Sequence, residues 1–468
     1  MAFHIYNTMS RKKEELVPLN GKKIRMYTCG PTVYNYAHIG NFRAYMFEDL
    51  LRRYIQFAGF EVEQVQNLTD VDDKTIRHSI EQGKSLNEFT ALYKEAFFHD
   101  LSVLNIQPAE HYPAATDYIP QMIEMIQGLV DKGYGYQSED GSVYYRIDKF
   151  DRYGCLARLD REGMRSGSRV SQDEYEKDNV ADFALWKAHV ESDGDVYWDS
   201  PWGRGRPGWH IECSAMSTSI LGETFDLHTG GVDNIFPHHE DEIAQSEALS
   251  GKTYAKYWMH CGYLIVDGRK MSKSLGNFYT MQDLLDKGYS GREIRYELLA
   301  THYRQALNFT FASLEANRAA LRRLDEFYFS LKEVAGSETE GATLPDWAIQ
   351  AKTSFVNEMD DDMNISGAFG ALFDLVHTGN IALSNHAVSA KEAVALLGLW
   401  AELDIVLGLL IPSDSSVPEE VEQLAALRVA ARTDKNWEES DRLRDEIAML
   451  GWQVKDGPEG YKLRKLSS

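Results

Sequence analysis

Two short segments of this chain carry residues suited to binding a nucleoside triphosphate. The first runs from Cys29 through Gly-Pro-Thr-Val-Tyr-Asn-Tyr-Ala to His38-Ile-Gly40-Asn41 and joins a predicted strand to a predicted helix. Gly40 has no Cβ, so a nucleotide can approach the backbone closely, and the first helical turn offers N–H groups to phosphate. We expect His38 and Asn41 to donate hydrogen bonds to phosphate oxygens as negative charge develops on them.

The second segment is Lys270-Met271-Ser272-Lys273-Ser274, which precedes Gly276. Small hydroxyl residues and glycine favour a mobile loop, and its two lysines can close over a triphosphate. We expect Lys273 to offset the charge of the leaving pyrophosphate, Lys270 to assist, and the whole segment to line the ATP site. An exposed basic turn has a similar composition, so this interpretation depends on both segments occurring in one chain.

Four residues that lie far apart in the sequence have the types that bind zinc. His238 and Glu242 are four residues apart in a predicted helix opening near Pro237, so their side chains are expected on one helical face. Cys213 and Cys29 supply thiols. Two thiolates, an imidazole and a carboxylate suit zinc. Spacing alone leaves open that the cysteines are buried core residues and that the histidine belongs to a solvated helix cap.

The predicted elements around the first segment form a β–α–β unit. Residues 22–28 and 61–68 are predicted strands, and an amphipathic helix that stops at Gly59 lies between them. Such a unit indicates a parallel sheet with a right-handed crossover, in which ligands gather at the carboxyl ends of the strands. Three candidate residues fall at those ends: Cys29, His38 and Thr69.

Composition and length indicate an ordinary globular protein of about two to four domains. The chain has 468 residues, 43% hydrophobic and 26% charged, and only four cysteines, which favours free thiols in a reducing compartment. We find neither an apolar run near the roughly 20 residues needed to span a bilayer nor a signal peptide. The net charge of −23 argues against indiscriminate binding to DNA or other nucleic acids. We therefore expect a cytoplasmic protein that contacts neither DNA nor a membrane.

The chain resembles the cysteinyl-tRNA synthetase family, which belongs to the class I aminoacyl-tRNA synthetases, over essentially its whole length. The resemblance rests on stretches that begin at Cys29, Asn67, Phe183, Gly205, Phe236 and Lys270. It implies an α/β fold: a Rossmann-like class I catalytic domain with an insertion, followed by a helical bundle and a small C-terminal anticodon-binding domain. His38-Ile-Gly40-Asn41 resembles the His-x-Gly-His element of class I synthetases, with Asn41 at the fourth position.

The family organisation also implies domain boundaries. The expected parts are the first half of the catalytic domain (1–115), a connective insertion (116–200), the second half with the zinc ligands (201–262), the lysine loop and stem-contact region (263–320), a helical bundle (321–415) and the anticodon-binding domain (416–468). We expect the protein to be a monomer.

The resemblance further assigns roles to individual residues. It implies a zinc ion held by Cys29, Cys213, His238 and Glu242 that binds the substrate thiolate, which separates cysteine from serine because zinc prefers a soft thiolate to a neutral hydroxyl. The amino-acid pocket is expected to be formed by Gly30, Thr69, Trp209 and Asp233. Thr229 stands where the family more often has glycine. The substrates would be L-cysteine, ATP with Mg²⁺, and tRNA(Cys).

The C-terminal segment is the weakest part of the resemblance. Arg428 to Asp445 fits the family's pattern, but the end of the chain lacks the family's usual tryptophan before Arg464. Trp437 can stack on a base, although a tryptophan in a helix more often packs in a core.

Three alternative functions remain open from the sequence. A related cysteine ligase that acts on an amino-sugar shares the ATP segments and the zinc ligands but lacks the RNA-binding tail. A zinc hydrolase would use His238 and Glu242 without ATP. A non-catalytic RNA-binding paralogue is opposed by the intact lysines of the loop.

Overall fold

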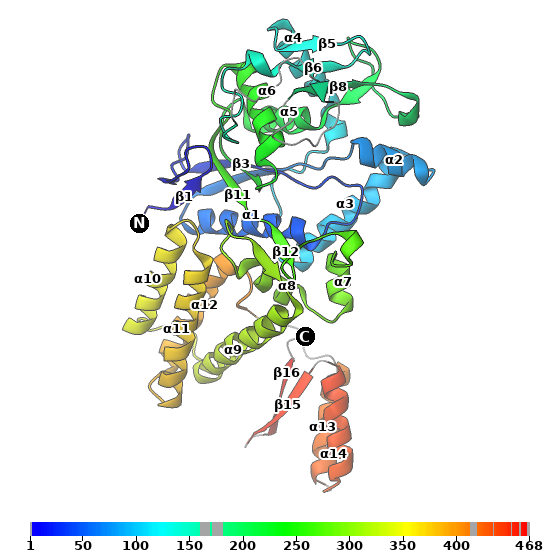
Figure 1. The fold of residues 1–468 in the computed structure, drawn as a ribbon. Coiled ribbons are helices and arrows are strands. Elements are labelled where there is room, and N and C mark those ends of the chain that lie inside the picture. The colour runs from blue at the N-terminus through cyan, green and yellow to red at the C-terminus, as the bar shows by residue number, and fades with distance from the viewer. Residues whose placement is uncertain are drawn as a thin grey trace. The chain divides into compact units, whose positions relative to one another are not determined.

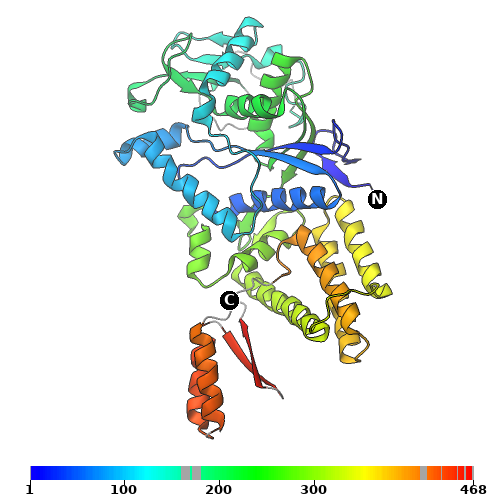
Figure 2. The same ribbon diagram turned by 180° about the vertical axis from the view of Figure 1, so that it is seen from behind.

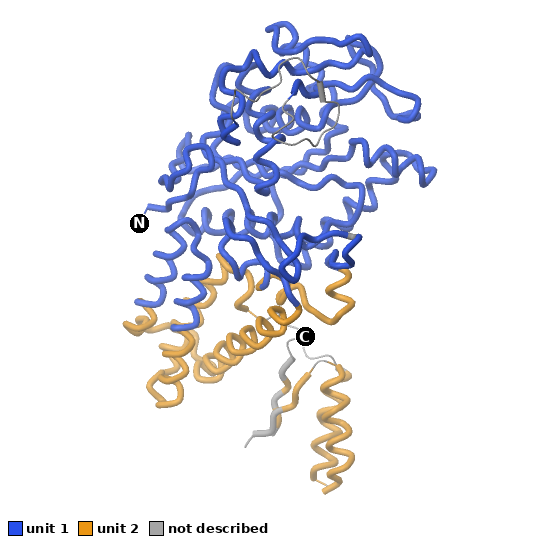
Figure 3. Tube along the Cα trace, viewed as in Figure 1, with its two compact units in different colours: residues 1–281, 297–310, 350–374 blue, residues 282–296, 311–349, 375–468 orange. Residues whose placement is uncertain are grey.

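The computed structural model describes residues 2–159, 169–170, 181–411, 419–433, 435–450, 452–457 and 460–465. It forms two compact units (Figure 3), one of residues 1–281, 297–310 and 350–374, and the other of residues 282–296, 311–349 and 375–468. Among the described residues, every helix falls short of the length and apolar character that crossing a membrane requires.

A four-stranded parallel sheet lies at the centre of the first unit. Its order is β11 (Ala255–Cys261), β10 (Phe225–Gly231), β3 (Lys23–Thr28), β4 (Glu61–Gln66). Thr28 at the end of β3 pairs with Thr229 of β10 on one side and with Gln66 of β4 on the other. The predicted β–α–β unit is confirmed.

Helices cover both faces of this sheet. Figure 1 shows α1 (Ile39–Phe57) on one face and α5 (Trp209–Leu221) and α6 (Glu240–Ser250) on the other, and Figure 2 shows the same order from behind. Apolar residues of β3, α5, α6 and β11 share one buried core, among them Tyr27, Met216, Ile243 and Trp258. The sheet is therefore buried on both faces, as parallel sheets require.

The start of α1 is fixed by its own first residues. His38 is the N-cap, and its ring nitrogen accepts a hydrogen bond from the Asn41 backbone N–H while the Asn41 side chain accepts one from the His38 N–H. This reciprocal capping box satisfies two N–H groups that would otherwise lack partners. At the other end the chain leaves the helix at Gly59, where φ is 90°.

The remaining elements of the first unit surround this layered core. The region of the predicted insertion holds α4 (Ile119–Asp131) and four strands of one sheet, β5 (Gly135–Gln137), β6 (Val143–Tyr145), β8 (Asp182–Ala188) and β7 (Arg169–Val170). The fifth strand of that sheet, β9 (Gly205–Pro207), follows the predicted insertion and pairs with β8. The other elements are β1 (His4–Asn7), β2 (Lys12–Glu15), α2 (Asp73–Glu81) and α3 (Leu86–Val103). Residues 160–168 and 171–180 of the predicted insertion lie outside the described residues.

A small sheet carries the lysine segment. It consists of β13 (Arg269–Lys270), β12 (Leu264–Val266) and β14 (Leu307–Phe309). Asp267 and Gly268 both have positive φ in the turn that joins β12 to β13. Lys270 is the last residue of β13, and a short 3-10 turn (Lys273–Leu275) follows it. The segment is thus presented at the end of a tight hairpin.

The rest of the chain is mostly helical. It contains α7 (Met281–Asp286), α8 (Gly291–Leu299), α9 (Phe311–Ala335), α10 (Asp346–Asp360), α11 (Ile365–Ser384), α12 (Ala390–Leu407), α13 (Glu419–Thr433), α14 (Trp437–Met449), β15 (Trp452–Gly457) and β16 (Gly460–Lys465). In the second unit α9 packs against α12, and α13, α14 and β15 share a small core of Val421, Ala425, Ile447, Trp452 and Val454. The fold class predicted from the sequence is confirmed.

A buried carboxyl between α1 and β10 makes stability depend on pH. Glu48 accepts a hydrogen bond from the Thr229 hydroxyl at 3.0 Å, and burial raises its pKa from 4.5 to about 8. The folded protein therefore keeps a proton that the unfolded chain loses above pH 4.5, so its free energy of unfolding falls as pH rises through this range to about pH 8. The shift is equivalent to no more than about 5 kcal/mol.

We predict that Glu48→Gln, which has no proton to lose, flattens this decline in stability. Calorimetric melting temperatures at about pH 5.5 and about pH 8.5 measure it. Glu124→Gln, at an exposed position on α4, should keep the wild-type dependence. An equal decline in all three proteins would contradict the assignment.

Candidate active site and metal centre

The two predicted nucleotide segments meet in the structure. The Ile39 N–H donates a hydrogen bond to the Tyr279 carbonyl at 3.0 Å, and the His38 ring lies edge-on to Phe278 at a centroid distance of 5.0 Å. A Cβ built on Gly40 would lie 3.0 Å from the Cε atom of Met271. The start of α1 and the lysine segment therefore form one site, and a side chain at position 40 would press on both.

The lysine segment is held by its own polar groups. The Ser272 N–H donates to Asn277 Oδ1 at 2.8 Å, and the Asn277 amide donates to the Lys270 carbonyl at 3.2 Å. The hydroxyls of Ser272 and Ser274 lie 3.1 Å apart. The Lys270 side chain is exposed, and the side chain of Lys273 lies outside the described part of the structure.

The four predicted metal ligands come together in the structure. One ligand atom from each of Cys29, Cys213, His238 and Glu242 lies within 4.8 Å of the others. The four residues come from the end of β3, from α5, from the turn before α6 and from the first turn of α6, respectively. Fold topology thus joins residues that the sequence separates.

The local reason for the pairing of His238 with Glu242 is the one that the sequence suggests. Phe236 is non-helical (φ −143°, ψ 132°), and the helical segment Ile235–His239 then continues directly into α6 at Glu240, so a helix opens near Pro237 as predicted. The pair faces inward, with His238 Nε2 3.2 Å from Glu242 Oε1 and both side chains buried. A solvated cap is therefore excluded for His238.

Sequence reasoning missed two histidines of the same cluster. His228 and His239 form a second possible four-donor set with Cys29 and Glu242, again with ligand atoms within 4.8 Å. His239 Nε2 lies 3.2 Å from Cys29 Sγ. The signals available in the sequence were the adjacent pair of histidines at 238–239 and the histidine that opens the glycine-rich stretch at 228–231.

The electrostatics of the cluster fit a bound cation. Burial raises the pKa of both Cys29 and Cys213, and burial lowers the pKa of His238 to about 3. Burial also acts to raise the pKa of Glu242, but His228 and His238 outweigh it, so the net shift is downward. Neutral imidazoles beside a carboxylate and two thiols are the groups that zinc binds.

A buried oxygen of Glu242 supports this fit. Glu242 Oε1 accepts no hydrogen bond from any described residue, although it is fully buried. An unpartnered buried carboxylate oxygen is costly unless a cation takes the place of the donor. The residues present therefore fit a zinc ion.

Further hydrogen bonds to the Nδ1 atoms orient His238 and His239. His238 Nδ1 lies 3.0 Å from His210 Nδ1, and His239 Nδ1 lies 2.9 Å from His260 Nε2. His260 in turn lies 2.7 Å from the Thr8 hydroxyl. The Nε2 atoms of His238 and His239 face the cluster, toward Glu242 and Cys29 respectively. Partners on the outer nitrogen fix the orientation of ligating imidazoles in this way.

The predicted amino-acid pocket borders this cluster. The Trp209 ring stacks on His238 at a centroid distance of 4.3 Å, so it forms a wall beside the metal ligands. A Cβ on Gly30 would lie 1.7 Å from the Asn67 carbonyl, so only glycine fits there. The buried Thr69 hydroxyl donates to Glu212 at 2.9 Å, and Asp233 is exposed.

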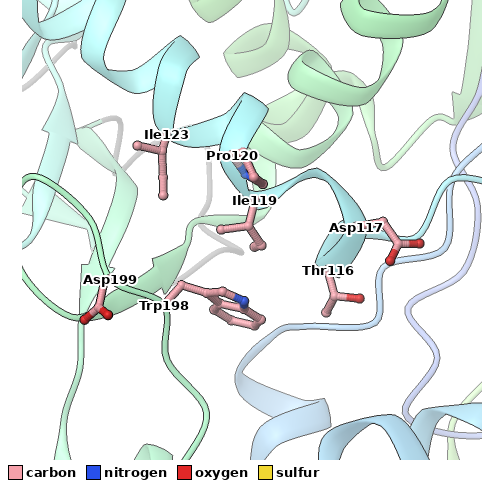
Figure 4. A pocket seen from close by; sticks show the side chains of 7 residues that line it. All are labelled: Thr116, Asp117, Ile119, Pro120, Ile123, Trp198 and Asp199. Carbon is pink, nitrogen blue, oxygen red and sulfur yellow. The ribbon is translucent and has the colours of Figure 1, made fainter.

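A shallow hollow elsewhere in the first unit is lined by none of the candidate site residues. Figure 4 shows it between the start of α4 and the chain at Trp198, with a volume of about 620 Å³. It is lined by Thr116, Asp117, Ile119, Pro120, Ile123, Trp198 and Asp199. The candidate chemistry is therefore not at this hollow.

Comparison with known proteins identifies the family. Residues 15–319 match the model for the class I (C) tRNA synthetase catalytic domain, residues 354–411 the DALR domain, and residues 414–464 the cysteinyl-tRNA ligase anticodon binding domain. The chain is 53% identical to a cysteine–tRNA ligase of Protochlamydia amoebophila, covering 98% of this chain and 97% of that protein. It is 49% identical to the cysteine–tRNA ligase of Chlamydia trachomatis serovar A, with both chains fully covered.

A solved structure supports the fold. Mycobacterium tuberculosis methionyl-tRNA synthetase in complex with methionyl-adenylate superposes with a TM-score of 0.61 at 15% identity, covering 84% of this chain and 91% of that one. At this identity the likeness concerns the fold alone. The domain matches and the two relatives show that the chain belongs to the cysteine–tRNA ligase family of class I aminoacyl-tRNA synthetases.

Proposed function

We propose that this chain activates L-cysteine with ATP and transfers it to the 3′ end of tRNA(Cys). The observation that carries the proposal is the meeting of three features in one unit. The capped start of α1 contacts the lysine segment at Met271, and the cluster of thiols, imidazoles and Glu242 lies at the end of the adjoining strand β3. These features would provide an anion-binding corner and a site suited to a thiol within the same unit.

In the activation step the carboxylate of cysteine attacks the α-phosphorus of ATP. A P–O bond forms to the carboxylate, and the bond to the leaving pyrophosphate breaks. The N–H groups at the start of α1, with His38 and Asn41, are proposed to stabilise charge on the phosphate oxygens. Lys270 and Lys273 are proposed to offset the charge of the pyrophosphate, together with Mg²⁺.

Selection of cysteine is assigned to the buried cluster. Cys29, Cys213, His238 and Glu242 would hold zinc, which supplies a soft Lewis acid that prefers a thiolate to a hydroxyl. Trp209 would close the pocket by its stacking on His238.

The amino end of the substrate is assigned to the rest of the pocket. The exposed carboxylate of Asp233 would pair with the substrate ammonium. Gly30 and Thr69 would line the backbone side of the pocket, since the Thr69 N–H donates to the Pro31 carbonyl at 3.0 Å and so holds that strand end in place.

In the transfer step the terminal ribose hydroxyl of the tRNA attacks the activated carbonyl carbon. An ester bond forms, the bond to the phosphate of AMP breaks, and AMP leaves. The match of residues 414–464 to an anticodon-binding domain favours tRNA as the acceptor over an amino-sugar, because the amino-sugar ligase was expected to lack such a tail.

Helices α13 and α14 carry a basic and an aromatic side chain that are candidates for contact with the anticodon. Trp437 is 58% exposed at the start of α14, so the expectation that it packs in a core is wrong. The Arg432 guanidinium lies over its ring at 5.7 Å. An exposed indole beside a cation can stack on a base and attract the backbone. We propose that this pair contacts tRNA.

The finer organisation stays a prediction. We propose the division at residues 1–115, 116–200, 201–262, 263–320, 321–415 and 416–468, a monomeric enzyme and a cytoplasmic location.

Replacing Lys273 tests the ATP site. We predict that Lys273→Ala lowers cysteine-dependent ATP–pyrophosphate exchange by about 10²-fold to 10³-fold, because a charge that acts on the leaving pyrophosphate is removed. Lys252→Ala, which removes an exposed lysine paired with Glu223, should leave the exchange rate unchanged. Wild-type exchange by the Lys273 variant would contradict the assigned role.

Replacing a thiol of the cluster tests the metal centre. We predict that Cys213→Ser lowers bound zinc from about one ion per chain and reduces exchange with cysteine by at least about tenfold, because a thiolate ligand is lost. Cys261→Ser is a matched control, since Cys261 is equally buried but donates to the Arg43 carbonyl outside the cluster. Metal analysis and exchange assays measure both effects. Full zinc content in the Cys213 variant would refute the assignment.

Replacing Trp437 separates RNA binding from activation. We predict that Trp437→Ala raises the KM for tRNA about tenfold, equivalent to a lost stacking contact of about 1.4 kcal/mol, and leaves exchange unchanged. Trp437→Phe should recover most of the loss. An unchanged KM in the alanine variant would show that the exposed indole does not contact tRNA.

A further inference from the structure

The two oxygens of Glu242 have different surroundings. Oε2 lies 2.8 Å from His228 Nε2 and accepts a hydrogen bond from the Tyr254 hydroxyl at 2.9 Å. Oε1 instead faces His238 Nε2 at 3.2 Å and accepts no hydrogen bond from a described residue. Oε2 is thus held by His228 and Tyr254, whereas Oε1 faces the predicted ligand His238.

The His228 ring is fixed by the strands around it. His228 pairs with Trp258 of β11 on one side and with Tyr27 of β3 on the other. Its ring stacks on Trp258 at a centroid distance of 4.6 Å and an interplanar angle of 14°. Because β10 is an inner strand, the ring cannot move away from Glu242 without disturbing the sheet.

Tyr254 reaches the same oxygen from another element. It is fully buried just before β11, its ring is edge-on to Phe225 at 4.9 Å, and its hydroxyl lies 2.6 Å from the Ser217 hydroxyl. Ser217 belongs to α5, which also carries Cys213. The packing of its ring on Phe225 and the contact of its hydroxyl with Ser217 therefore fix the direction of the Tyr254 hydroxyl toward Glu242.

We infer that His228 and Tyr254 are positioning residues that hold Glu242 through Oε2, so that Oε1 alone is presented to the cation bound with Cys29, Cys213 and His238. This inference rests on the proposed metal centre. A carboxylate held in this way loses little rotational freedom when it binds an ion. Removing such an outer partner typically weakens metal binding by about 10-fold to 100-fold.

The alternative role for His228 is that of a ligand in the second donor set. If His228 were a ligand, loss of the Tyr254 hydroxyl would change zinc affinity little, because the imidazole would bind the ion in place of the oriented carboxylate. The tyrosine is therefore the sharper test, since its hydroxyl touches Glu242 and Ser217 and is not in either donor set.

The experiment measures zinc affinity of the full-length protein by competition with a chromophoric chelator. We expect Tyr254→Phe to weaken zinc binding by about 10-fold to 100-fold. Tyr145→Phe is the matched control, because Tyr145 is equally buried. Its hydroxyl donates at 3.0 Å to the carbonyl of Ala244, which lies on α6 together with Glu242. The control should keep wild-type affinity. Equal affinity in the two phenylalanine variants would overturn the inference.

A double-mutant cycle shows whether the effect passes through Glu242. In a Glu242→Ala background, Tyr254→Phe should cause no further loss of zinc affinity, because the oxygen that it positions is absent. A further loss of tenfold in that background would also overturn the inference. His228→Gln, which keeps an amide donor at the position of Nε2, should retain more affinity than His228→Leu.

The cobalt-substituted protein provides a readout that does not depend on activity. Its visible spectrum should keep its tetrahedral pattern in Tyr254→Phe, since the ligands are unchanged and only their hold on the ion is weaker. A changed pattern would assign Tyr254 or its neighbours a direct role in coordination and contradict the inference. Wild-type protein without zinc would contradict the metal centre itself, whereas zinc held normally by the Tyr254 variant would contradict this inference alone.

Discussion

The first unit depends on the burial of a polar cluster between its central sheet and the helices α5 and α6. Two thiols, three imidazoles and a carboxylate are packed together there, next to the apolar core of the unit. Burying such groups is unfavourable unless each finds a partner, and burial lowers the pKa of His238 and His239 and raises the pKa of Cys29 and Cys213. A zinc ion would satisfy the remaining oxygen of Glu242 and favour the thiolate forms. The same ion would then account for the choice of a thiol substrate.

The end of β3 connects this cluster along the chain to the proposed nucleotide corner. Cys29 follows β3 directly, and its N–H donates to the Thr229 carbonyl at 3.3 Å, so the ends of β3 and β10 are locked together. Nine residues after Cys29 the chain caps α1 at His38, and residues 278–280 bring the lysine segment onto the same corner. A hydrogen-bonded strand end, a capped helix and a hairpin thus converge, and each is a local structure that short sequence segments specify.

Sequence alone predicted the elements whose signals are local. The β–α–β unit follows from the two predicted strands, the amphipathic helix between them and Gly59. The reciprocal capping of α1 by His38 and Asn41 was not predicted, because the same residue types also suit phosphate binding. The meeting of Cys29 with Cys213 is a long-range contact, and only family resemblance indicated it. The roles of His228, His239 and Tyr254 could not be predicted, because each depends on which atom faces Glu242 or Cys29 after the sheet has formed. The type of Trp437 alone favours a place in a core, whereas its position as the first residue of α14 leaves it exposed.

Zinc X-ray absorption spectroscopy tests the central claim most directly, because it counts the sulfur atoms bound to the ion. We predict two sulfur ligands in the zinc-loaded protein, from Cys29 and Cys213, and a third when L-cysteine is added. L-serine at the same concentration should leave the count at two. A sulfur count that does not rise with cysteine would contradict the claim that the buried cluster selects the substrate through its thiol.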